Sequence, residues 1–247
     1  MAIKRRDFLA GAGGLLAAAT TLDSTAQAAP EQSAANAPAN PAPSPSRAFN
    51  GPYQGAHLGQ VAFPMGGFGA GMICLEGAGA LSHVSIRNRP EIFNEPCVFA
   101  AISVKGTEPL ARVLEGPVPS RKIFGPVGSA VGIPVTTYGL PRFAEASFEA
   151  RFPFGKVTLT DPLLPFGVEV TGWSPFTPGN ADDSSLPVAG LEYRFTNHTA
   201  TDVEAVFSFN AKNFLTPEKA PPDLQAVRKA PGGFTLWNGA QPGKPWE

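Results

Sequence analysis

Apolar and polar side chains alternate along much of the chain, which is the pattern of β-strands with one buried face. Every second residue is apolar in four segments, over 157–160, 168–171, 191–196 and 203–209. Side chains two positions apart point to the same face of a strand, so each segment has an apolar face and a polar face. Convincing helical periodicity is absent after residue 28. The pattern predicts an all-β fold, a large antiparallel β-sandwich whose two layers bury their apolar faces against each other.

The residues between these segments predict how the strands connect. Asn197–Asp202 is polar and rich in turn formers, which predicts a hairpin between the strands on either side of it. The prolines and mixed charges of 215–230 predict a loop, whereas the apolar residues of 234–237 predict another short strand.

The segment 63–90 is crowded with glycine. Glycine loses more backbone freedom on folding than any other residue, so this density indicates places where a tight turn, a bulge or a close backbone approach requires it. We therefore predict that Gly66, Gly67, Gly69 and Gly71 form a structural turn motif.

A nucleotide-binding loop does not fit this segment. The dinucleotide fingerprint requires the spacing G-x-G-x-x-G, but Met72 and Cys74 stand where the third glycine would be needed. The phosphate-loop pattern fails as well, because no Gly-Lys-Ser or Gly-Lys-Thr follows the glycines.

The N-terminus has the features of an export signal. Arg5 and Arg6 precede an apolar run over 8–22, and Ala26-Gln27-Ala28 supplies the small residues that a signal peptidase recognises. The run is too short and too weakly apolar for a transmembrane span, which needs about 20 residues. We predict a twin-arginine signal peptide over 1–28 and a periplasmic or extracellular destination in a bacterium.

Two further regions follow the predicted signal peptide. Residues 29–57 are rich in alanine and proline and nearly free of charge, so they predict a flexible linker. Residues 58–247 hold the predicted β-sandwich. The whole chain has a net charge of −1, which gives no reason to expect nucleic acid or an anionic membrane surface as a partner.

Four motifs in the predicted domain together resemble one known family. They are GGFGAG (66–71), LEGAGALSHVSIRNRP (75–90), GLPRF (139–143) and PFTPGNADDSSLPVAGLEYRFTN (175–197). Their order resembles the N-terminal domain of glycoside hydrolase family 116, the group of the non-lysosomal glucosylceramidase or bile-acid β-glucosidase. The resemblance covers roughly residues 58–215.

This resemblance implies a function that is completed elsewhere. Family members continue into an (α/α)6 barrel that packs on the β-domain and holds the two carboxylates of a retaining β-glucosidase. No position of this chain matches that pair, so we assign no catalytic residue and expect a truncated, non-catalytic domain. The implied partners are the barrel and a β-glucoside or glycan, with no cofactor. A free-standing carbohydrate-binding or structural sandwich is the alternative.

Arg87, Asn88, Arg89 and Trp173 are the candidate residues for a substrate or a domain interface. The N-R-P sequence belongs to the family resemblance, and its fork-shaped donors could dock on the barrel or line its sugar pocket. An inter-strand salt bridge is the other interpretation. Trp173 and Phe176 could each stack on a sugar ring, although an aromatic side chain in a strand is more often part of the core.

Two acidic pairs could be mistaken for catalytic carboxylates. Asp182 and Asp183 precede two serines in a predicted turn, where side-chain oxygens commonly accept hydrogen bonds from backbone N–H groups. Glu91 and Glu95 lie in a proline-bounded loop, where solvation is the simpler expectation. We assign a structural role to the first pair and none to the second.

Metal binding and a disulfide are the remaining possibilities. The three histidines have no metal-ligand spacing and no cysteine cluster beside them, so we predict no metal site. Cys74 and Cys97 could form a disulfide after export or remain buried thiols, and the sequence leaves both open.

Overall fold

The structure is a computed structural model that describes residues 46–86, 90, 94–106, 108–124, 137–215 and 225–239. The predicted signal peptide, with Arg5 and Arg6, lies outside the described residues. Arg87, Asn88 and Arg89 also lie outside them.

The described strands pair in four antiparallel groups. The largest sheet has the order β1 (Tyr53–Gln54), β7 (Glu145–Arg151), β8 (Phe154–Thr160), β9 (Phe166–Trp173) and β10 (Gly190–Asn197). A second sheet has the order β2 (Ala62–Met65), β3 (Met72–Glu76) and β4 (Leu81–Ser85). A third has the order β11 (Ala205–Ala211), β5 (Val98–Val104) and β6 (Leu110–Val113). β12 (Gln225–Ala230) and β13 (Gly233–Asn238) form a hairpin.

Helical turns are short in the described part of the chain. They are the 3-10 turn η1 (Gly55–Gln60), α1 (Ser120–Phe124) and α2 (Ala181–Ser184). None of the helices in the described ranges is long and apolar enough to cross a bilayer.

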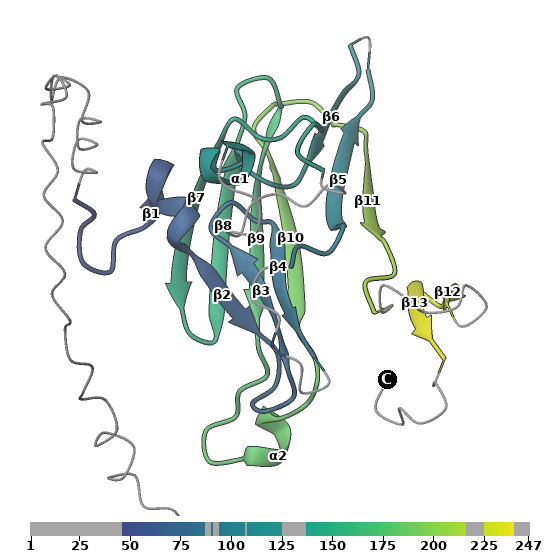
Figure 1. The fold of residues 1–247 in the computed structure, drawn as a ribbon. Helices are drawn as coiled ribbons and strands as arrows, with labels where there is room; N and C mark the ends of the chain where they lie inside the picture. The colour runs from purple at the N-terminus through teal and green to yellow at the C-terminus, as the bar shows by residue number, and fades with distance from the viewer. Residues whose placement is uncertain are drawn as a thin grey trace, which may run out of the picture. The chain divides into compact units, whose positions relative to one another are not determined.

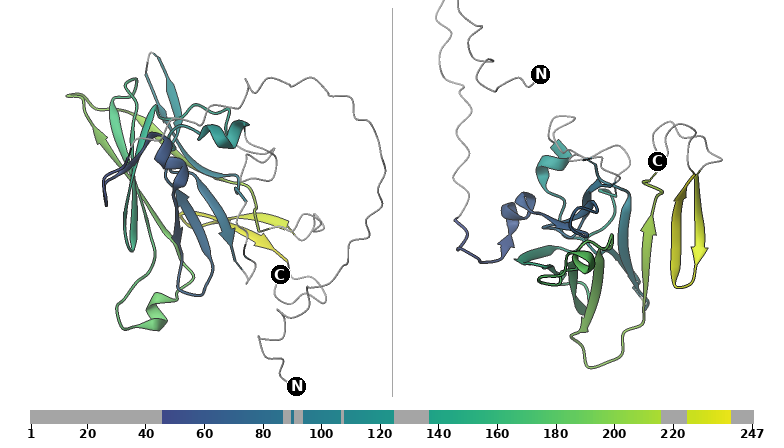
Figure 2. Two further views of the ribbon diagram at one scale, coloured as in Figure 1. Left: turned by 60° about the vertical axis from the view of Figure 1, so that its left-hand side comes forward. Right: turned by 90° about the horizontal axis from the view of Figure 1, so that it is seen from below.

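The sheets stack face to face around one apolar core, as predicted for an all-β sandwich. Figure 1 shows β2, β3 and β4 in front of the five-stranded sheet, and Figure 2 shows the same layers from two further sides. Leu75 of β3 and Phe148, Val157 and Leu159 of the large sheet are fully buried in this core. Strands β8 and β9 carry the alternation seen in the sequence, with every second residue buried. The predicted fold class is confirmed.

Two glycines set the distance between the stacked sheets. Gly155 of β8 and Gly172 of β9 are directly opposite each other in the ladder. A Cβ at Gly155 would lie 2.8 Å from the Phe63 ring, and one at Gly172 would lie 2.4 Å from the Met65 sulfur. Side chains of β2 therefore occupy the space that a side chain at either glycine would need. The two sheets can pack closely at this point because both positions are glycine.

The predicted hairpin around Asn197–Asp202 is wrong. β10 pairs with β9 and β11 pairs with β5, so the chain crosses from one sheet to another between them. The aromatic faces of the two strands meet across the sheets, with the Tyr193 and Phe207 ring centroids 5.3 Å apart. Facing strands let these rings pack against each other across the two sheets.

Two predicted boundaries also need correction. The sequence predicts a linker to residue 57, but β1 and η1 begin within it, because Tyr53 pairs with Phe148 and packs edge-on against its ring at 6.3 Å. The predicted loop over 215–230 contains β12. The sequence of β12 has a weak strand pattern, and its pairing with β13 stabilises the strand. The predicted strand at 234–237 is confirmed as part of β13.

Candidate functional site

The glycine motif lets the β2–β3 connection lie against a distant segment of backbone. Gly71 has φ = 97°, a conformation that side chains disfavour. A Cβ on Gly67 would lie 2.2 Å from the Leu186 carbonyl oxygen. The Phe68 N–H donates to the Ser184 carbonyl at 2.9 Å. Gly66 and Gly69 also have positive φ. The motif thus allows the β2–β3 connection to lie in close contact with the backbone of residues 184–186.

Asp182 and Asp183 lie on the single turn of α2. Asn180 is its N-cap: the Asn180 Oδ1 accepts from the Asp183 N–H at 3.1 Å, and its amide donates to the Asp183 carboxylate at 2.7 Å. Ser184 is buried and its hydroxyl accepts from the Thr177 N–H at 3.0 Å. In this turn the side-chain oxygens of Asn180 and Ser184 accept from backbone N–H groups. Asp182 and Asp183 are exposed and lie near the positive, N-terminal end of the turn.

An aromatic patch, which we define as Phe68, Phe152 and Phe176, lies beside α2. The three rings come from the β2–β3 connection, the β7–β8 turn and the β9–α2 connection, which meet at the lower end of the sandwich in Figure 1. They are 59%, 58% and 42% exposed. Ring centroids are 5.0–6.2 Å apart, and the Phe176 ring stands nearly perpendicular to the other two. Leu186 is also exposed, and its backbone carbonyl lies next to Gly67.

Trp173 covers the neighbouring strand. It is directly opposite Gly190, and a Cβ on that glycine would lie 1.9 Å from the indole ring. The ring therefore packs over the space that glycine leaves on β10. Its side chain remains 37% exposed at the end of β9.

A buried charge cluster, which we define as Glu76, Glu95, Lys122 and Tyr138, joins four separate parts of the chain. The Lys122 ammonium donates to both Glu76 carboxylate oxygens at 2.6 and 2.8 Å, and it also donates to Glu95. The Tyr138 hydroxyl donates to the other Glu95 oxygen at 2.5 Å. The Lys122 side chain is only 3% exposed. Glu95 is thus tied into the fold rather than solvated, contrary to the expectation from its loop position.

A second ion pair lies close to this cluster. Arg142 donates from Nε to Glu115 at 3.1 Å and from a terminal nitrogen to the Thr137 carbonyl at 2.8 Å. Burial raises the pKa of Glu115, and the positive charge of Arg142 opposes that shift. Burial and the hydrogen bond to Glu95 raise the pKa of Tyr138, which keeps its hydroxyl protonated as a donor.

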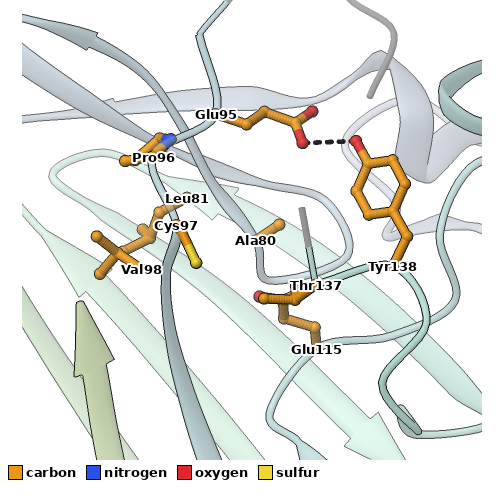
Figure 3. Close-up of a pocket in the computed structure, with 9 residues that line it drawn as sticks. All are labelled: Ala80, Leu81, Glu95, Pro96, Cys97, Val98, Glu115, Thr137 and Tyr138. Carbon is orange, nitrogen blue, oxygen red and sulfur yellow. Dashed lines mark hydrogen bonds between the residues drawn. The ribbon is translucent and has the colours of Figure 1, made fainter. Parts of the chain in front are cut away.

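A small cavity separates the cluster from the ion pair. Glu95, Glu115, Thr137 and Tyr138 line its polar side, as Figure 3 shows together with the hydrogen bond between Tyr138 and Glu95. Its volume is about 30 Å³, which is room for one or two water molecules. Ligand pockets typically measure about 300–1,000 Å³. A sugar ring therefore does not fit in this cavity.

The two cysteines are free thiols in the structure. Cys74 is buried in β3, and burial together with the charge of Glu76 raises the pKa of its thiol to about 11. Within the described ranges, no three His, Cys, Asp or Glu side chains gather as a metal ion would require.

The charge cluster is the feature that sequence reasoning missed. Its residues are separated by up to 62 positions between Glu76 and Tyr138, so no local spacing indicates it. One signal was available: Glu76 is the only charged residue of the apolar motif LEGAGAL, as Arg142 of the neighbouring ion pair is of GLPRF. A lone charge inside an apolar motif needs a partner when it is buried.

The family comparison covers the region that contains these features. Residues 62–233 match the family profile described as "beta-glucosidase 2, glycosyl-hydrolase family 116 N-term". None of the curated proteins matches the chain. The matched residues make up more than half of the sequence and include the glycine motif, the charge cluster and the aromatic patch. The chain therefore belongs to glycosyl-hydrolase family 116 and contains the family's N-terminal domain.

Proposed function

We propose that this chain is the non-catalytic N-terminal β-sandwich of an exported retaining β-glycosidase of the β-glucosidase or glucosylceramidase type. It buttresses the catalytic (α/α)6 barrel of that enzyme and shapes its entrance. Membership of the family supports a catalytic partner domain. The paired residues Arg5 and Arg6 support export through the twin-arginine route.

The observation that carries the proposal is the aromatic patch. Its three phenylalanines form an exposed apolar surface at one end of the sandwich, where contact with water is unfavourable. The Phe176 ring stands at 77° and 71° to the other two, so the three rings do not share one plane on which a sugar could stack. A contact with another protein domain fits such a surface better than glycan binding by a free-standing module.

The chain alone is expected to release no product from a chromogenic β-glucoside. Of the carboxylates that line its cavity, Glu95 is bonded to Lys122 and Tyr138 and Glu115 to Arg142, and the cavity is too small for a sugar. Spectrophotometry with a known β-glucosidase as positive control checks this expectation. Release that disappears in Glu95→Gln or Glu115→Gln would refute the scaffold assignment.

The patch is expected to stabilise the two-domain enzyme. In a polypeptide that carries both domains, Phe152→Ser with Phe176→Ser should lower the midpoint of thermal inactivation by roughly 5–10 °C, because interface aromatics contribute about 1–2 kcal/mol each. The matched control is Val227→Ser in β12, at an equally exposed apolar position away from the patch. Equal midpoints for both variants would contradict a docking role.

A further inference from the structure

Strand β11 is an open edge in the described part of the chain. It pairs with β5 on one side, and no described strand pairs with its other side. The residues just outside its two ends both form backbone hydrogen bonds toward β5. The Glu204 carbonyl accepts from the Lys105 N–H at 2.9 Å, and the Lys212 N–H donates to the Cys97 carbonyl at 2.8 Å. Bonding direction alternates along an antiparallel strand, so the odd-numbered residues between them present N–H and C=O groups to the open side. These are Ala205, Phe207, Phe209 and Ala211.

This edge has none of the features that protect exposed edges from pairing. The seven residues AVFSFNA include no charge and no proline, and Phe207 and Phe209 are 44% and 39% exposed. The edge of the large sheet differs, because β10 carries Glu192 and Arg194 on its polar face. Charged side chains and prolines discourage strands from pairing at sheet edges, so β11 is the edge best suited to accept another strand.

We propose that two copies of this chain associate through their β11 strands, paired antiparallel about a two-fold axis at Ser208. This register places Phe207 opposite Phe209 of the second copy, and both residues have outward-facing N–H and C=O groups. The two three-stranded sheets then join into one six-stranded sheet. Each aromatic pair occurs twice, as the symmetry of an isologous interface requires.

Charge complementarity at the ends of β11 selects this occupant. In the same register, Glu204 lies opposite Lys212 of the second copy, so a pair of opposite charges forms at each end. Lys212 is exposed in the free chain. Glu204 contacts Lys105 at 2.5 Å through exposed side chains, and a carboxylate can accept from both lysines. A strand chosen without regard to sequence would not match both the aromatic and the charged positions.

The hairpin β12–β13 is the competing occupant of this edge. The Asn213 amide donates to the Trp237 carbonyl at 2.8 Å, and the Phe234 ring lies 6.4 Å from that of Phe209. These contacts place the hairpin at the C-terminal end of β11. If it instead covers the whole edge in solution, the chain remains a monomer.

Sedimentation equilibrium of the full chain tests the proposal. The expected result is a reversible change from the mass of one chain to that of two as concentration increases. Ser208→Lys places two like charges at the two-fold axis and should raise the dissociation constant more than about tenfold. The matched control is Ser103→Lys, at an exposed position of β5 that pairs with Val206 and should leave dimerisation unchanged. Circular dichroism verifies that both variants fold.

A charge exchange tests the register. Lys212→Glu should weaken the dimer roughly tenfold, because two attractive pairs become repulsive, and adding Glu204→Lys should restore most of the affinity. A chain that is monomeric at every concentration overturns the proposal. Dimers that tolerate Ser208→Lys, or that are not rescued by the charge exchange, overturn it as well.

Discussion

Replacing Lys122 with methionine is expected to lower the free energy of unfolding by about 3–5 kcal/mol, the usual cost of removing one member of a buried ion pair. Lys122 is the cation shared by Glu76 and Glu95, and its side chain is 3% exposed. Methionine has a similar length, so the main change is the loss of charge and of three hydrogen bonds. Denaturant unfolding followed by circular dichroism measures the effect.

Two comparisons isolate the buried charge as the cause. Lys105 pairs with Glu204 at the surface, so Lys105→Met should change the free energy of unfolding by less than about 1 kcal/mol. Adding Glu76→Gln and Glu95→Gln to Lys122→Met removes the unpaired negative charges and should recover part of the loss. If Lys122→Met unfolds at the same denaturant concentration as the parent chain, the cluster does not hold the fold together.

The layers of the fold could be predicted from sequence, but the strand partners could not. Alternation in β8 and β9 reflects one buried and one wetted face, a local property that the sequence records directly. The partner of β11 is β5, about a hundred residues earlier in the chain. Local turn signals between β10 and β11 indicated a bend, and they do not distinguish a hairpin from a crossover between sheets.

The candidate site also has one part that the sequence could predict and one that it could not. The glycine motif was predictable because glycine has a steric meaning at a single position, and Gly67 and Gly71 both show it. The charge cluster was not, because Glu95 and Lys122 have a role only once the fold brings them together. Glu95 in a loop looks like any solvated carboxylate until its neighbours are known.

Gly67 connects the motif to the proposed docking surface, and Gly67→Ala is expected to destabilise the domain by about 2–3 kcal/mol. A Cβ there would lie 2.2 Å from the Leu186 carbonyl oxygen and 2.5 Å from the Ser185 carbonyl carbon. Both are backbone atoms that cannot move away as a flexible side chain would, so the connection must shift, at a cost typical of overpacking. The midpoint of thermal unfolding should fall by roughly 5–10 °C.

Gly139→Ala is the matched control for this substitution. Gly139 also lies in a family motif, but it is exposed and no atom lies within 4 Å of its added Cβ. Its substitution should leave stability unchanged or raise it by up to about 1 kcal/mol, since alanine restricts the unfolded chain. Because Phe68 follows Gly67 directly, displacement of the connection should also alter the aromatic patch. Equal stability of Gly67→Ala and Gly139→Ala would contradict the close contact at Leu186, and with it the role of the motif in holding Phe68 beside Phe152 and Phe176.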